Sequence, residues 1–138
     1  MFLPIFGFGA QVLYVGDTAK KDLFLDAAGR KKLHFFELAH DALPDVVAYC
    51  EERNWLYLIE AVTTANPITE LRRSALLQAA STCNADIILV TAFPDRSIYR
   101  RFAHAIAWEI EVWIADAPEH MIHFNGDKFL GPYKQKAD

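Results

Sequence analysis

Hydrophobic positions along the chain predict a sheet with helices around it. Two apolar runs, Val46–Tyr49 and Trp55–Val62, flank the polar stretch Glu51–Asn54, which predicts an antiparallel hairpin. The second run is apolar on both faces, so we expect it to form a central, buried strand. Further strands are predicted at Gln11–Val15, Asp86–Phe93, Glu111–Ala115 and Met121–Asn125.

Helix signals separate these strands. Asp17-Thr18 resembles an N-cap, and a polar helix is expected from there to about Lys32. Pro67 and Thr69 open a second helix, and Pro94-Asp95 start a third that runs to about Trp108. This order of elements predicts an α/β (α+β) fold with a mixed sheet flanked by helices. The second helix is expected to reach about Thr82 with an apolar stripe of Leu71, Ala75, Leu76, Ala79 and Ala80, and with Arg72 and Arg73 just off it.

Composition is consistent with one packed cytoplasmic domain. The chain has 138 residues, of which 53% are hydrophobic and 13% aromatic. Its apolar start lacks the basic region and cleavage site of a signal peptide, and no run is long enough to predict a membrane span. Cys50 and Cys83 have no metal or redox spacing, so we expect reduced thiols. The net charge of −4 does not by itself indicate DNA binding, although the basic residues are grouped.

A pair of carboxylates is the most informative feature. If Glu51–Asn54 is the hairpin loop, Cys50 faces Trp55, and Asp45 and Glu60 lie opposite each other on one face. Their Cβ atoms would then be about 4.5–5.5 Å apart. Two carboxylates repel at this distance, and a divalent cation such as Mg²⁺ relieves the repulsion by taking both as ligands. The alternative is that Asp45 merely follows Pro44 at the strand entry and that Glu60 pairs with an arginine.

Several segments together resemble a known family. They include Leu43-Pro44-Asp45-Val46-Val47, Ile59-Glu60-Ala61-Val62-Thr63, Val90-Thr91-Ala92-Phe93-Pro94-Asp95 and Ala107-Trp108-Glu109, in this order along the chain. From about Gly9 to Pro132 the chain resembles the C-terminal catalytic domain of the BsuBI/PstI restriction endonucleases, in the PD-(D/E)xK nuclease superfamily. The resemblance implies Mg²⁺-dependent hydrolysis of double-stranded DNA by a type II restriction enzyme.

The resemblance also assigns roles to residues. Asp45, Glu60 and the carbonyl of Ala61 would bind Mg²⁺. The superfamily lysine would fall at Val62, which carries no charge. Arg72 on the following helix is the preferred substitute as a catalytic residue, and the alternative for it is a solvated helix face.

Partners follow from the same resemblance. Asp17, Lys20, Lys21, Arg73 and Lys128 are candidates for contact with DNA, and the alternative for the basic ones is a solvated side chain. Cutting both strands of a palindrome implies a homodimer. Family members carry an N-terminal half for DNA recognition, so residues 1–138 are expected to be a single nuclease domain without it. The alternatives are a nuclease-fold remnant that binds DNA or a protein without cutting, and a repair or defence nuclease that recognises DNA structure.

Overall fold

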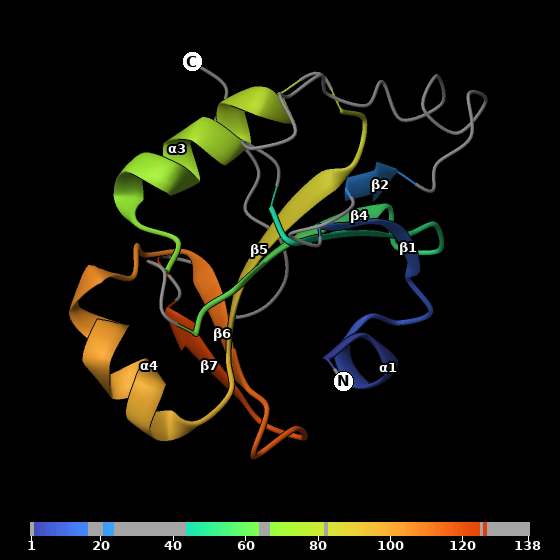
Figure 1. The fold of residues 1–138 in the computed structure, drawn as a ribbon. Helices are drawn as coiled ribbons and strands as arrows, with labels where there is room; N and C mark the ends of the chain where they lie inside the picture. The colour runs from blue at the N-terminus through green and yellow to red at the C-terminus, as the bar shows by residue number, and fades with distance from the viewer. Residues whose placement is uncertain are drawn as a thin grey trace.

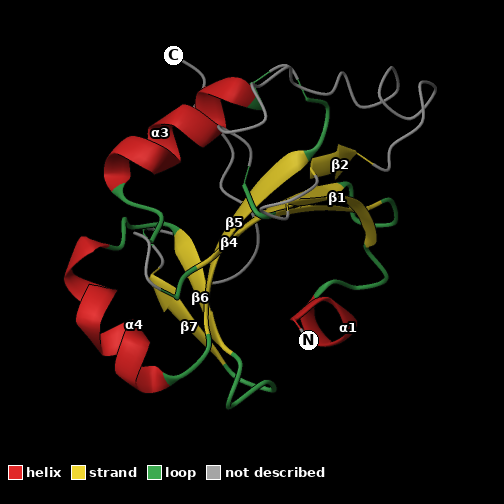
Figure 2. Ribbon diagram, in the orientation of Figure 1, coloured by secondary structure: helices red, strands yellow, loops and turns green. Residues whose placement is uncertain are grey.

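The fold is one mixed sheet of seven strands with helices on both of its faces (Figures 1 and 2). A computed structural model describes residues 2–16, 21–23, 44–63, 67–81, 83–124 and 126. The described elements are α1 Phe2–Phe6, β1 Gln11–Gly16, β2 Lys21–Leu23, β3 Val46–Cys50, β4 Trp55–Ala61, α3 Glu70–Ala79, β5 Asp86–Phe93, α4 Arg96–Phe102, the 3₁₀ turn η2 Ala103–Ala105, β6 Ile110–Ile114 and β7 Met121–Phe124.

The strand order is β2-β1-β3-β4-β5-β6-β7. The pairs from β2 to β4 are antiparallel, β4, β5 and β6 run parallel, and β7 returns antiparallel to β6. The parallel strands are joined through α3 and α4, as parallel neighbours require. The predicted mixed α/β (α+β) sheet with flanking helices is therefore confirmed.

The β3–β4 hairpin has the register that the sequence predicts. Cys50 pairs with Trp55, and the pairing continues in step to Val46 and Ile59. Asn54 adopts a left-handed conformation with φ 56°, which Asn tolerates better than most residues, and its N–H donates to the carbonyl of Glu51 at 3.3 Å. This turn fixes the register.

The two faces of the sheet pack against different helices. Leu56 and Leu58 of β4 point to the face that α3 covers, where they meet Leu76 and Ala80. Tyr57 and Ile59 point to the opposite face, where they pack with Phe2 of α1. Helix α4 lies on the same side of the sheet as α3, and α1 lies across from both (Figure 1). Period-two alternation along β4 therefore places Glu60 on the α3 face.

The apolar stripe predicted for the second helix is wrong in its first turn. Leu71 is 84% exposed and Ala75 is also exposed, whereas Leu76 and Ala80 are buried. Arg72 and Arg73 are half-buried and face the sheet instead. They occupy that face because Glu60 on β4 and Glu109 just before β6 pair with them. The helix also ends at Ala79, before the predicted Thr82.

Other predicted boundaries differ as well. Residues Lys21–Leu23 form β2 against β1, so the helix predicted from Asp17 is wrong there, because pairing with a sheet edge outweighs local helix propensity. The other residues of that predicted helix lie outside the described residues. Helix α4 ends at Phe102 and continues as η2, so it is shorter than predicted. Helix α1 was not predicted.

Candidate active site

Asp45 is held at the entry of β3 by the end of β4. Its Oδ2 accepts a hydrogen bond from the backbone N–H of Ala61 at 2.7 Å. The hairpin register brings these two residues together, since Val46 already pairs with Ile59. A carboxylate that accepts a backbone N–H is fixed in direction and keeps a second oxygen for another partner. The predicted proximity of Asp45 to the Glu60–Ala61 end of β4 is thus observed.

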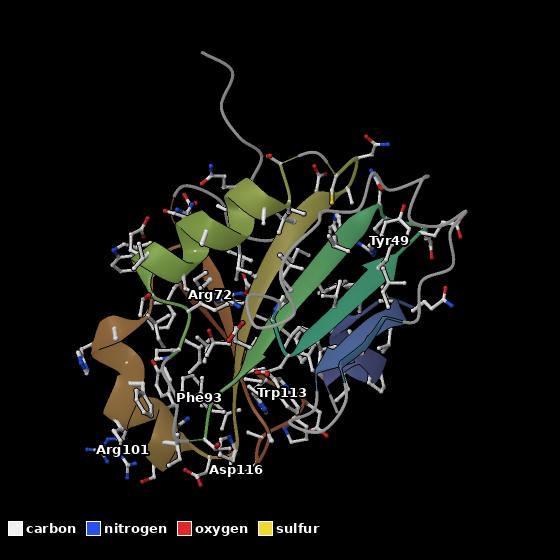
Figure 3. The ribbon with its side chains drawn as sticks, turned by 45° about the horizontal axis from the view of Figure 1, so that its top comes forward. Tyr49, Arg72, Phe93, Arg101, Trp113 and Asp116 are labelled. Atoms are coloured by element: carbon white, nitrogen blue, oxygen red, sulfur yellow. The ribbon has the colours of Figure 1, made fainter. Side chains whose placement is uncertain are left out.

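Glu60 forms an ion pair with Arg72. The distance from Arg72 Nη2 to Glu60 Oε1 is 2.8 Å, and the two side chains are 27% and 17% exposed. Figure 3 shows Arg72 extending from α3 toward the sheet. The sequence left open whether Glu60 binds a metal or pairs with an arginine, and the arginine pairing is present. An ion pair does not exclude metal binding, because each carboxylate has two oxygens.

The first turn of α3 places Arg72 beside Glu60. Thr69 is the N-cap, at the helix start that the sequence predicts, and its side-chain oxygen accepts the N–H of Arg72 at 3.3 Å. The preceding residue, Ile68, is fully buried; its N–H donates to the Thr91 hydroxyl at 3.4 Å, and its carbonyl accepts the N–H of Ala107 at 3.0 Å. The first turn of α3 is therefore tied to β5 and to the segment before β6.

Val62 lies in the core. It is 1% exposed and packs with Phe93, Val112 and Ile114. It follows Glu60 by two positions and shares its face, as the sequence predicts for the position of the missing lysine. Here the position contributes packing, so the cation beside Glu60 comes from Arg72 on α3.

Arg73 pairs with two carboxylates. Its Nη2 contacts Glu109 Oε2, and its Nη1 lies 3.2 Å from Glu70 Oε1. The Arg73 side chain is 21% exposed. Arg73 was a candidate for contact with DNA, and in the structure these two carboxylates pair with its guanidinium. Sequence reasoning assigned no role to Glu109, although Ala107-Trp108-Glu109 is one of the segments that carry the family resemblance, because its partner Arg73 is distant in sequence.

Of the other candidates for contact with DNA, only Lys21 belongs to the described residues. Asp17, Lys20 and Lys128 lie outside the described residues. Lys21 is in β2, where its backbone pairs with Gly16, and its side chain is not described. Among the residues that the structure describes, no group of three or more His, Cys, Asp or Glu side chains is arranged to hold a metal ion. The predicted ligand set, with two carboxylates and one backbone carbonyl, is smaller than such a group.

A buried carboxylate and a histidine pair on the opposite face of the sheet. Glu111 of β6 is 7% exposed and contacts His123 of β7. Burial raises the pKa of the Glu111 carboxyl, and the neighbouring His123 opposes that rise. Glu111 shares its face with Trp113, which packs on the α1 side, so this pair is separate from Asp45 and Glu60.

Comparisons with known proteins agree with this architecture. The model of the BsuBI/PstI restriction endonuclease domain matches residues 1–127. The chain is 44% identical over 133 residues to the type II restriction enzyme BsuBI of Bacillus subtilis, and 38% identical over 87 residues to the type II restriction enzyme AplI of Arthrospira platensis. The structure of the SdaI restriction endonuclease matches with a TM-score of 0.83 and 39% identity over 97% of this chain. The chain belongs to the BsuBI/PstI restriction endonuclease family.

The shared region is only part of these relatives. The alignment to BsuBI covers 96% of this chain and 42% of the relative, and the SdaI match also covers 42% of that chain. The AplI alignment covers 63% of this chain and 27% of the relative. Within the described residues, no helix combines the length and apolar character needed to cross a membrane.

Proposed function

We propose that this chain is the catalytic domain of a type II restriction endonuclease that hydrolyses phosphodiester bonds of double-stranded DNA with Mg²⁺ in the cytoplasm. The observation that carries the proposal is the convergence of Asp45, Glu60 and Arg72. Asp45 binds the N–H of Ala61 at the end of β4, and the residue before Ala61, Glu60, pairs with Arg72, in a chain of this family. Acidic groups suit a divalent cation, and the guanidinium suits a phosphate.

The donor set fits Mg²⁺. Asp45 and Glu60 would supply carboxylate oxygens, which are the hard ligands that this ion prefers. Paired strand residues exchange N–H and C=O bonds along the same edge. Because the N–H of Ala61 points to Asp45, its carbonyl would point to the same side and could serve as the third protein ligand. When bound, the ion would acidify a water molecule and offset negative charge on the scissile phosphate.

The chain's own residues would orient the reaction. Asp45 is held in direction by the N–H of Ala61, so its carboxylate keeps its place before DNA arrives. Arg72 would balance charge that develops on the phosphate, because a guanidinium is a positively charged, forked donor. An arginine is a poor general base, so we assign it no proton transfer.

The need to cut both strands of DNA bears on the oligomeric state. We infer a homodimer, because cutting a palindrome on both strands needs two sites related by a two-fold axis. The chain spans 42% of the length of the relative BsuBI, and recognition of a DNA sequence would belong to length that is not shared. A form that binds DNA without cutting is the second candidate, because Val62 occupies the lysine position within the core.

Plasmid cleavage tests the proposal. The purified chain is incubated with supercoiled plasmid in Mg²⁺ or in EDTA, alongside Asp45→Ala and Glu60→Gln. We expect Mg²⁺-dependent nicking that falls by about 100-fold or more in both variants. The control is Asp116→Asn, which removes an exposed carboxylate in the turn after β6, far from Arg72 in Figure 3, and should cut like wild type. No cutting by wild type, even at high enzyme concentration with Mn²⁺, would favour the binding candidate.

A further inference from the structure

Two adjacent arginines of α3 reach carboxylates on either side of β5. Arg72 pairs with Glu60 on β4, and Arg73 pairs with Glu109 immediately before β6. Since β5 lies between β4 and β6 in the sheet, the two ion pairs tie the helix to the sheet at two separated points. Successive residues of an α-helix point about 100° apart, so a rotation of α3 that loosens one pair also displaces the other.

The segment that carries Glu109 also anchors the approach to α3. The N–H of Ala107 donates to the carbonyl of Ile68 at 3.0 Å, directly ahead of the cap Thr69. Two residues later, the Glu109 carboxylate contacts Arg73 in the first turn of the helix. Residues 107–109 therefore hold the start of α3 through a backbone contact and a side-chain contact.

The backbone at Glu109 is unusual. Its φ is 68°, in the left-handed region that non-glycine residues seldom occupy. The conformation is held by a hydrogen bond from its N–H to the carbonyl of Phe124. Gly126 lies beside the carboxylate, and a Cβ there would come within 3.1 Å of Glu109 Oε1. A residue held in a sparsely populated conformation by its surroundings suggests a functional constraint on where its side chain is placed.

Glu109 is the less exposed of the two carboxylates that pair with Arg73. The Nε of Arg73 is buried and has no hydrogen-bond partner among the described residues, so the two terminal nitrogens carry its pairing. Its other carboxylate, Glu70, has a side chain that is 68% exposed, whereas that of Glu109 is 28% exposed. Solvent screens the Glu70 contact more strongly.

We propose that Glu109 is a positioning residue, which fixes the first turn of α3 through Arg73 so that Arg72 meets Glu60 and the scissile phosphate. This inference rests on the proposed nuclease function for its catalytic consequence. The positioning itself is a property of the fold and can be measured without DNA.

The test compares Glu109→Gln with Glu70→Gln, which removes the other carboxylate on Arg73 as a matched control. We expect Glu109→Gln to lower kcat for plasmid nicking by about 10- to 100-fold with KM for DNA within about twofold, as a misplaced group would. Glu70→Gln should leave both constants within about twofold of wild type. A variant that only loosened the fold would lower the melting temperature without this separation of kcat from KM.

The second measurement is ¹⁵N relaxation at the Nε–H group of Arg72. Its order parameter should be high in wild type and in Glu70→Gln, and should fall below about 0.6 in Glu109→Gln. Unchanged kcat and unchanged order in folded Glu109→Gln would overturn the proposal. If wild type cuts no DNA, the proposed function fails while the order parameters still decide the positioning role. If Glu109→Gln does not fold, Arg73→Lys, which keeps the charge but loses the fork, must show the same losses, and unchanged values there overturn the proposal.

Discussion

The cation beside Glu60 is an arginine on a helix, and this choice limits what it can do. A guanidinium stays charged, donates through a planar fork and suits an oxyanion, whereas a lysine can also exchange a proton. Arg72 also lies 2.8 Å from Glu60, so it neutralises the acid that it accompanies. The charge at this site is therefore supplied from α3, and position 62, directly after β4, is available for packing.

Val62→Lys tests whether that strand position can still carry the charge. Val62 is 1% exposed among apolar side chains, so an ammonium group there would be buried without a partner. We expect a loss of about 3 kcal/mol in the free energy of unfolding, measured by urea denaturation, and no gain in DNA cleavage.

The neighbouring residue provides the control. Thr63 is exposed, so Thr63→Lys adds the same charge one position later and should change stability by less than about 0.5 kcal/mol. A stable Val62→Lys protein that cuts DNA faster than wild type would contradict the assignment of this position to the core.

At the scale of elements, α3 links the core to the site. Its far end buries Leu76 and Ala80 against β4 and β5, and its first turn presents Arg72 and Arg73 to carboxylates. The cap Thr69 belongs to the part of the helix that presents Arg72, because its hydroxyl oxygen accepts the N–H of Arg72. Changes at the cap should therefore affect activity more than stability alone predicts.

Thr69→Ala removes this cap. We expect a loss of about 1 kcal/mol in unfolding free energy and a fall in kcat for nicking, because the first turn of α3 loosens around Arg72. Asp95→Ala is the matched control, since Asp95 caps α4 by accepting the N–H of Ile98 at 2.9 Å. It should cost a similar free energy and leave kcat unchanged. Equal kcat losses in both variants would mean that stability, and not the placement of Arg72, controls cleavage.

How far the sequence predicts these elements depends on how local their causes are. The β3–β4 register follows from a short turn and alternating side chains, so the approach of Asp45 to the end of β4 was predictable. The inward face of α3 was not, because Arg72 and Arg73 are drawn there by acids on β4 and before β6. Strand β2 forms by pairing with β1, and the local sequence pattern does not predict this pairing.

At the scale of the molecule, basic side chains are grouped on α4 although the net charge of the chain is −4. Helix α4 exposes Arg96, Arg100 and Arg101 on the side of the sheet that also carries α3 and the candidate site. Figure 3 shows Arg101 at the outer side of this helix. Exposed arginines can attract the negatively charged DNA backbone, and the nearby carboxylates can hold the Mg²⁺ that the proposed reaction uses. The acidic total therefore does not argue against DNA as the substrate.

Metal binding should stabilise the whole fold, because only the folded hairpin brings Asp45 and Glu60 together. An ion that binds the native state alone adds about 2.7 kcal/mol to the unfolding free energy at 100 times its Kd. We expect the unfolding free energy of wild type, measured by urea denaturation, to rise by this amount when EDTA is replaced by Mg²⁺ at 100 times its Kd.

Two variants locate the ion. Asp45→Asn should lose most of this increase, and Asp116→Asn, which changes an exposed carboxylate outside the site, should keep it. An equal Mg²⁺ effect in both variants would place the ion elsewhere on the protein. No effect in wild type would mean that the Arg72–Glu60 ion pair keeps the ion out until DNA brings its phosphate to the site.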